Sequence, residues 1–230
     1  AALITPLVVQ RTTTWKEIPF ALLAVIILEV TANDIWLNGG STSTLTRGDG
    51  LVLLGFFTIF LYYIFGIAKK GDIEEQHIEK RSVGHALAFV TVGLAGLILG
   101  GKWVVESAVT LAEAWGLSQS VIGLTVIAVG TSLPELATSV VAALKGKSDM
   151  AIGNVIGSNI FNIFWILGIT AIIAPLPFSN ESNIDVAVTT AVTVLLFAGM
   201  FIGRKHEVER WQGGVFVVLY IIYVAYLLMR

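Results

Sequence analysis

The chain has 230 residues, of which 56% are hydrophobic and only 13% charged, and its mean hydropathy is +0.85. Soluble domains carry about 25% charged residues, so this composition excludes an ordinary soluble enzyme and a disordered chain. The 14 basic and 16 acidic residues nearly cancel, which excludes a nucleic-acid-binding surface. Because the sequence has no cysteine, disulfides, thiolate metal sites and cysteine nucleophiles are excluded too. The composition predicts an all-α polytopic membrane protein.

Seven stretches of the sequence approach the length of a membrane-spanning helix, which needs about 20 mostly apolar residues. They cover residues 18–33, 51–68, 85–100, 121–144, 150–173, 184–202 and 214–229. The third is short, and we expect it to continue through Lys102 and Trp103. Continuous apolar runs predict helices, because the strands of a barrel would alternate apolar and polar residues.

The basic residues predict the orientation of these spans. Seven alternating crossings place eleven Lys and Arg on one side: Arg11, Lys16, Lys69, Lys70, Lys80, Arg81, Lys145, Lys147, Arg204, Lys205 and Arg210. Only three lie on the other side: Arg47, Lys102 and Arg230. Since cytosolic loops are enriched in Lys and Arg, residue 1 is predicted on the cytosolic side and the C-terminus outside.

A weak internal repeat links the start of the chain to its last third. The segment AALITPLVV at 1–9 resembles TAIIAPLPF at 170–178, and the similarity keeps its order over about sixty residues at offsets of 163 to 169. The aligned pairs are Pro6 with Pro175, Leu7 with Leu176, Ile18 with Ile184, Arg47 with Arg210 and Tyr63 with Tyr226. The two copies have opposite predicted orientations, as in the inverted repeats of secondary transporters. Three spans precede the second copy, so we expect about 90 further residues before the first, forming two spans and most of a third.

One motif places a carboxylate inside a predicted span. In GLTVIAVGTSLPE at 123–135, Glu135 lies near the middle of the fourth span, where an ionisable side chain is costly and is a candidate functional group. Thr131 and Ser132 precede Glu135 by four and three residues, which puts their hydroxyls on the same helix face. Pro134 cannot donate to the main-chain oxygen of Gly130 and is expected to kink the helix.

A second motif, GNVIGSNIFN at 153–162, adds a polar stripe in the fifth span. Asn154, Ser158 and Asn162 recur every four residues and therefore share one helix face. Together the two motifs offer carboxylate, hydroxyl, amide and carbonyl oxygens, which suit a hard cation such as Na⁺ or Ca²⁺. Small polar residues also serve helix packing in membranes, and for Ser132 or Asn159 alone both interpretations stay open.

Carboxylates elsewhere are interpreted differently. Glu29, with Asn33 and Asp34 beside it, is placed at the outer end of the first span, and Glu106 at the outer end of the third. These residues are predicted to be interfacial rather than ion ligands.

The sequence from 123 to 163, GLTVIAVGTSLPELATSVVAALKGKSDMAIGNVIGSNIFNI, closely resembles the second α-repeat of the sodium/calcium exchanger superfamily, in its prokaryotic calcium/sodium antiporter branch. The resemblance covers the whole chain. It implies that the chain corresponds to the end of helix 3 and to helices 4–10 of an exchanger with ten helices in two inverted repeats. It assigns 1–68 to the C-terminal part of the first inverted repeat, 69–83 to a short cytosolic loop and 84–230 to the second inverted repeat, with its α-repeat at 121–173.

The resemblance implies exchange of Ca²⁺ for Na⁺ by alternating access across a prokaryotic plasma membrane, without a cofactor or nucleic acid. By position, the ion ligands of the family fall on the carbonyl of Ala128 and on Thr131, Ser132, Glu135, Ser158 and Asn162. Family members often carry Asp where this chain has Asn162, so the charge of the site is lower here. By symmetry, a second Glu is expected on the absent first α-repeat.

Other functions remain open at the level of the sequence. A proton-coupled antiporter, moving Ca²⁺ or Na⁺ against H⁺, would use the same scaffold, and a cation channel would use similar oxygen ligands. An intramembrane hydrolase is disfavoured, because no Ser/His pair or pair of Asp residues falls at membrane depth.

Overall fold

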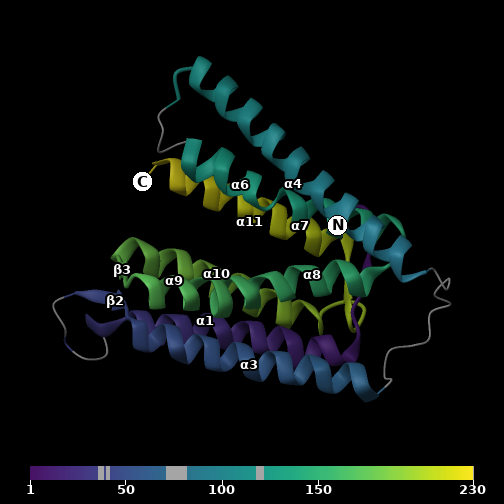
Figure 1. The fold of residues 1–230 in the computed structure, drawn as a ribbon, viewed down its shortest axis with the longest axis horizontal. Helices are drawn as coiled ribbons and strands as arrows, with labels where there is room; N and C mark the ends of the chain where they lie inside the picture. The colour runs from purple at the N-terminus through teal and green to yellow at the C-terminus, as the bar shows by residue number, and fades with distance from the viewer. Residues whose placement is uncertain (36–38, 40–41, 71–81, 118–121, 230) are drawn as a thin grey trace.

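The computed structural model describes residues 1–35, 39, 42–70, 82–117 and 122–229, and helices dominate this part of the chain (Figure 1). The elements are β1 (Leu7–Val8), η1 (Thr13–Glu17), α1 (Ile18–Ala32), β2 (Ser43–Leu45), α3 (Arg47–Lys70), α4 (Val83–Ala114), η2 (Gly123–Ile127), α6 (Ala128–Thr131), α7 (Leu133–Leu144), α8 (Ser148–Phe161), η3 (Asn162–Leu167), α9 (Gly168–Ile173), β3 (Leu176–Phe178), α10 (Asn180–Gly199), β4 (Glu207–Val208) and α11 (Arg210–Met229). The η segments are π-helical turns continuous with neighbouring helices.

Five helical segments in the described residues are long and apolar enough to cross a membrane: Arg47–Ile67, Val83–Ala114, Ser148–Ile173, Glu181–Gly199 and Arg210–Met229. A sixth forms if Thr125–Thr131 and Leu133–Leu144 together make one bent span. The predicted span at 18–33 corresponds to α1, which has only 15 residues and continues backwards into η1. The structure therefore supports a multi-pass membrane protein with five or six such helices, and the count of seven stays a prediction.

Local sequence signals explain several helix boundaries. Ser82 precedes α4 and accepts a hydrogen bond from the main-chain N–H of His85, and Ser179 caps α10 in the same way through Ser182. Serine is favoured at this position because its oxygen satisfies an otherwise unpaired N–H of the first turn. Gly116 follows α4 with φ of +75°, a left-handed conformation in which glycine ends a helix without strain.

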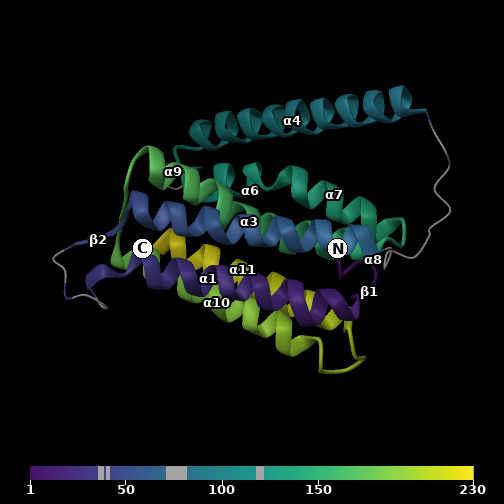
Figure 2. The same ribbon diagram turned by 60° about the horizontal axis from the view of Figure 1, so that its bottom comes forward.

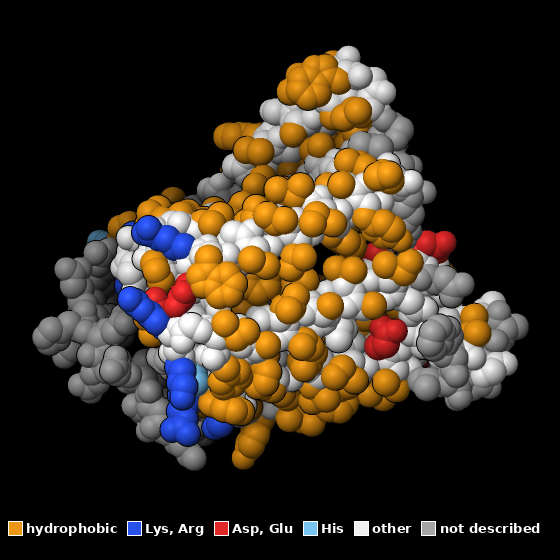
Figure 3. Space-filling view, turned by 180° about the vertical axis from the view of Figure 1, so that it is seen from behind, with side chains coloured by type: hydrophobic (Ala, Val, Ile, Leu, Met, Phe, Trp, Pro, Cys, Tyr) orange, Lys and Arg blue, Asp and Glu red, His pale blue; other side chains and the backbone are white. Residues whose placement is uncertain are grey.

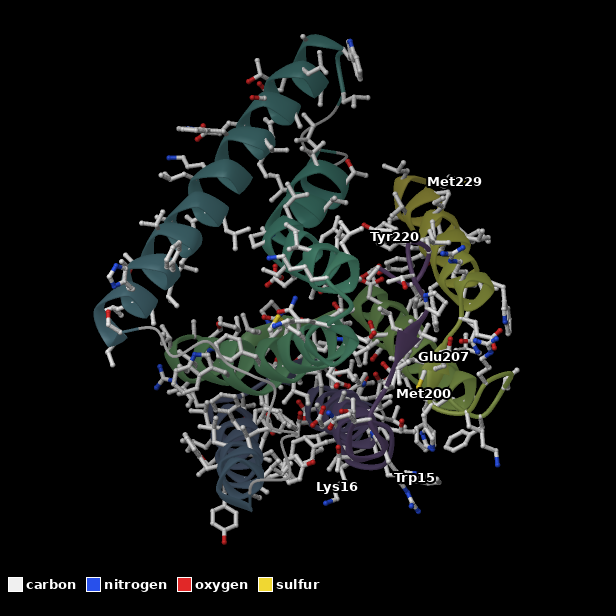
Figure 4. All side chains as sticks on the ribbon, turned by 90° about the vertical axis from the view of Figure 1, so that its right-hand side faces the viewer. Trp15, Lys16, Met200, Glu207, Tyr220 and Met229 are labelled. Atoms are coloured by element: carbon white, nitrogen blue, oxygen red, sulfur yellow. The ribbon has the colours of Figure 1, made fainter. Side chains whose placement is uncertain are left out.

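Two short antiparallel strand pairs connect segments far apart in the chain. β1 pairs with β4, with Leu7 opposite Val208, and β2 pairs with β3, with Leu45 opposite Leu176. The pairs lie at opposite ends of the helices, with β1 and β2 at opposite sides of Figure 2. Figure 4 shows the end that carries β4, with Glu207 and Met200 labelled near each other and Trp15 and Lys16 pointing outward. Each pair closes one end of the bundle.

Aromatic side chains fill the interior between α1, α3 and the α8–η3–α9 segment. Phe164 is fully buried, and its ring lies 5.7 Å from that of Phe56 and 5.8 Å from that of Phe20. Phe20 also stacks on Phe60 at 5.4 Å. Aromatic pairs at these distances add attraction beyond the burial of their area. This cluster fixes α1 and α3 against the segment that follows the second motif.

Helix α4 lies against a different part of the molecule. It projects at an angle beside α6 and α7 in Figure 1, and Ala112 is its only buried residue. Its exposed apolar side chains suit contact with lipid or with further protein. Figure 3 shows hydrophobic side chains along the length of the helices, whereas the Lys and Arg in view gather at one end. This distribution is the one expected for a protein that spans a bilayer.

Candidate functional site

The helix that carries the first motif is broken beside Glu135. Helix α6 ends at Thr131, α7 begins at Leu133, and the two axes differ by 51°. Ser132 lies at the break with φ of −94° and ψ of 2°, and its N–H donates to the main-chain oxygen of Val129 at 3.1 Å. Pro134 occupies the first turn of α7, where proline is tolerated because the N–H groups there lack helical partners. The kink expected from Pro134 is present.

Glu135 lies in the first turn of α7, immediately after this break. Its side chain is half-buried, and Oε2 is buried without a hydrogen-bond partner. The N-terminus of a helix carries a partial positive charge, which favours a carboxylate in the first turn. A buried carboxylate oxygen without a hydrogen-bond donor still requires a counter-charge or a proton. The carboxylate of Glu135 is therefore suited to binding a cation.

Asn154 connects Glu135 to the second motif. From α8, the Nδ2 of Asn154 lies 3.0 Å from the main-chain oxygen of Glu135 and 3.0 Å from the side-chain oxygens of Thr138 and Ser139. Ser139 is buried and donates from Oγ to the main-chain oxygen of Ala151 at 3.4 Å. A network of side chain and main chain therefore fastens the first turns of α7 to α8.

Only part of this network could be predicted from the sequence. Asn154 belongs to the polar stripe of the second motif, whereas Thr138 and Ser139 lie outside the predicted set of ligands. Ser139 lies four residues after Glu135, one turn further along the same helix face. That spacing is the only signal in the sequence that could have found it.

The remaining predicted ligands are distributed over both motifs. Ala128 begins α6 and Thr131 ends it, and the side chains of Thr131 and Ser132 are exposed. Ser158, on α8 one turn after Asn154, donates to the main-chain oxygen of Val155 at 3.0 Å and keeps its lone pairs for a further partner. Asn162 begins η3 and is exposed. Asn154 thus connects Glu135 to the helix of Ser158.

Helix α4 crosses this break at closely packed glycines. A Cβ added to Gly130 of α6 would lie 2.2 Å from Cγ2 of Val105, so only glycine permits the observed approach. Gly101, one turn earlier on α4, would place a Cβ 3.9 Å from Cγ of Pro134. An apolar cavity of about 330 Å³ continues between α4, η2 and α6. The close approach of α4 to α6 therefore depends on Gly130, whereas the contact at Gly101 has ordinary van der Waals spacing.

The charge of the site limits what it can bind unaided. The described residues contain no group of three or more His, Asp or Glu side chains positioned to hold a metal ion. Ca²⁺ prefers six to eight oxygen ligands, usually including several carboxylates. Glu135 supplies one negative charge, and the hydroxyl, amide and main-chain oxygens around it are neutral. By itself, this single carboxylate falls short of what a Ca²⁺ site requires.

Comparison with known proteins identifies the family. Residues 85–229 match the family described as sodium/calcium exchanger protein, which is more than half of the chain. The chain belongs to the sodium/calcium exchanger family. Membership of this family and the apolar helices together support a multi-pass membrane protein that transports cations.

Similar proteins place the chain in the prokaryotic branch of the exchanger family. The putative antiporter CaxA of Alkalimonas amylolytica is 34% identical over 96% of this chain and 70% of its own length. The sodium/calcium exchanger MaX1 of Methanosarcina acetivorans is 41% identical over 61% of this chain and 39% of its own. A solved structure of the sodium/calcium exchanger from Methanococcus jannaschii superposes with a TM-score of 0.77 at 34% identity, covering 97% of this chain and 68% of that one. The exchanger fold is thus shared along nearly the whole chain.

Proposed function

We propose that this exchanger-family protein carries out secondary active antiport of Ca²⁺ against Na⁺ by alternating access, with Glu135 as the central charged ligand. The observation that carries the proposal is the buried, unpartnered Oε2 of Glu135 beside the helix break at Ser132. Oxygen ligands from Ala128, Thr131, Ser132, Ser158 and Asn162 are proposed to complete this half of the site. All of these groups are hard donors, which suit Na⁺ and Ca²⁺.

The strand pairing supports an inverted-repeat architecture. The elements β1–α1–β2–α3 recur in the order β3–α10–β4–α11. In the sequence alignment, Leu7 corresponds to Leu176 and, at the offset of 163, Leu45 corresponds to Val208. The observed pairs, Leu7 with Val208 and Leu176 with Leu45, are then equivalent contacts exchanged between the two copies. Reciprocal pairing of this kind is what a two-fold axis in the membrane plane would generate.

Further ligands are proposed to come from outside these 230 residues. The chain corresponds to about 70% of the length of CaxA, and its own site supplies a single carboxylate. A Ca²⁺ site needs more negative charge than this. We infer that a segment equivalent to the first α-repeat adds a second carboxylate that faces Glu135.

The exchange mechanism follows from competition for this charge. Ca²⁺ and Na⁺ would neutralise the same carboxylates, so one ion species excludes the other. Only a neutralised site can close and reopen to the opposite side, because an uncompensated carboxylate is costly away from water. Each reorientation would therefore carry an ion, and net transport of one species would require return of the other.

Transport in proteoliposomes tests the proposal. The full-length gene product is reconstituted, and uptake of labelled Ca²⁺ is followed under an outward Na⁺ gradient and, separately, an outward H⁺ gradient. We expect uptake that requires Na⁺ and is lost in Glu135→Gln. A matched control is Glu106→Gln, which alters an exposed carboxylate 3.6 Å from Lys102 and should retain uptake.

The other outcomes separate the alternative functions. Uptake driven by H⁺ alone would identify a proton-coupled antiporter on the same scaffold. Flux that needs no counter-ion and does not saturate would identify a channel. Full Na⁺-driven uptake by Glu135→Gln would show that the central carboxylate is misassigned.

A further inference from the structure

A second group of polar side chains is packed where α1 meets the start of α10, distant in the chain from the Glu135 motif. Glu29 lies in the last turn of α1, Asn33 is its C-terminal cap, and Asn183 lies in the first turn of α10. Asn33 is 95% buried, since its relative exposure is 5%. The sequence alone placed Glu29 and Asn33 at a membrane interface, but the structure turns them toward a neighbouring helix.

Several oxygen acceptors in this group lie around one amide nitrogen, and others have no donor. Nδ2 of Asn33 lies 2.9 Å from the main-chain oxygen of Glu29, 3.3 Å from Oε1 of Glu29 and 2.7 Å from Oδ1 of Asn183. An amide nitrogen has only two hydrogens, so the three acceptors cannot all be satisfied by it. Two more oxygens, Oε2 of Glu29 and Oδ1 of Asn33, are buried without any hydrogen-bond partner.

The group also carries a negative charge without a basic partner. Within the described part of the chain, Glu29 forms no ion pair with Lys or Arg. The C-terminus of α1, where Glu29 and Asn33 lie, brings the negative end of one helix dipole to this group, and the first turn of α10, where Asn183 lies, brings the positive end of another. Buried oxygens and uncompensated charge at one point require either a proton or a cation.

We propose that Glu29, Asn33 and Asn183 form an accessory site for a monovalent hard cation of the size of Na⁺, separate from the site at Glu135. The carboxylate oxygens of Glu29 and the amide oxygens of Asn33 and Asn183 are the ligands. One carboxylate balances a single positive charge, whereas Ca²⁺ sites commonly use several carboxylates. The cation would fasten the end of α1 to the start of α10, and so one repeat to the other.

Thermal unfolding in detergent tests this site without relying on transport. The parent protein carries Glu135→Gln, so that the proposed transport site does not dominate Na⁺ binding. Its melting temperature is measured against NaCl, with choline chloride keeping the ionic strength constant, because a cation that binds only the folded state raises the melting temperature. We expect a saturable rise with Na⁺ that is absent with choline.

Three further variants make the assignment specific. In the Glu135→Gln background, Glu29→Gln should raise the Na⁺ concentration needed for the same shift at least about tenfold. Glu106→Gln, which changes an exposed carboxylate, should leave the Na⁺ response unchanged. Asn183→Asp adds a second carboxylate, so it should make Ca²⁺ the stronger stabiliser at this site.

The proposal is overturned if the parent shows no Na⁺-specific rise, since Glu29 is then simply protonated. It is equally overturned if Glu29→Gln leaves the Na⁺ response intact. Should Glu29→Gln fail to fold, the Asn183→Asp variant decides: a switch of preference from Na⁺ to Ca²⁺ supports the site, and an unchanged preference refutes it.

Discussion

The side-chain amide of Asn154 lies 3.0 Å from the main-chain oxygen of Glu135, which joins α8 to the first turn of α7. The contact holds the main chain at Glu135 against the helix that carries Ser158. It also links the two sequence motifs through an interaction that neither motif shows by itself. Asn154 therefore acts as a positioning residue rather than as a proposed ion ligand.

Replacement of Asn154 by Ala should loosen α7 from α8. The change removes contacts with the Glu135 oxygen, Thr138 and Ser139, and it leaves buried Ser139 with fewer partners. We expect a loss of about 1–3 kcal/mol in the free energy of unfolding, together with reduced transport. Asn159→Ala, an exposed position on the same helix, is the control and should melt close to the wild type. Equal melting temperatures for the two variants would contradict the structural role of Asn154.

Gly130→Ala should push α4 away from the helix break. Its Cβ would lie 2.2 Å from Cγ2 of Val105, an overlap expected to cost about 1–3 kcal/mol. Val105→Ala in the same chain should restore much of the lost stability, and a double-mutant cycle of melting temperatures measures this coupling. Gly123→Ala, where nothing lies within 4 Å of the added Cβ, is the matched control. Simple additivity of the two changes would argue against the α4–α6 contact.

Gly50→Ala should destabilise the packing of α3 against α9. An added Cβ would lie 2.6 Å from the main-chain oxygen of Gly168, and a main-chain atom cannot move aside as a side chain can. We expect a loss of about 3 kcal/mol or more. Gly55→Ala on the same helix meets nothing within 4 Å and should be neutral or slightly stabilising, because Ala favours helix over Gly. Chemical denaturation in mixed micelles would compare the two, and similar midpoints would refute the close contact.

Glu17 should make stability depend on pH. It lies one residue before the first predicted span and lines a cavity of about 550 Å³ that also contains Asp149 and Lys16. Burial raises the pKa of Glu17 above its ordinary value, a hydrogen bond with Thr13 opposes this, and the charge of Asp149 raises the pKa further. The folded state therefore binds the proton more tightly than the unfolded state does. The stability that Glu17 contributes by binding this proton is fully present below the pKa that Glu17 has in the unfolded state. This stability is lost as the pH rises through the pKa that Glu17 has in the folded state.

Glu17→Gln should remove the loss of folding stability that ionisation of Glu17 causes as the pH rises. We expect the variant to melt at a higher temperature than the wild type at neutral pH, with the difference vanishing below about pH 4. Melting curves across this range check the prediction, with Glu106→Gln as a control that should follow the wild type throughout. A variant less stable than the wild type at neutral pH would mean that ionised Glu17 is stabilising.

Several features could be predicted because they depend on local residue patterns. Apolar length located the spans that became α3, α4, α10 and α11, since a helix in lipid must satisfy its own main-chain groups. The restricted backbone of Pro134 predicted the break in the helix beside Glu135. The weakest span to predict was the first, because α1 is short and begins in a π-helical turn with charged neighbours.

The sequence by itself determined that the chain is a helical membrane protein and where the carboxylate of Glu135 falls, because composition, periodicity and proline act within one helix. Only the tertiary structure decided which helices touch. The pairing of Leu7 with Val208, the bridge from Asn154 to Glu135 and the meeting of Asn33 with Asn183 join residues up to about 200 positions apart. Such contacts depend on how helices pack in three dimensions, and the spacing of residues along one helix does not predict them.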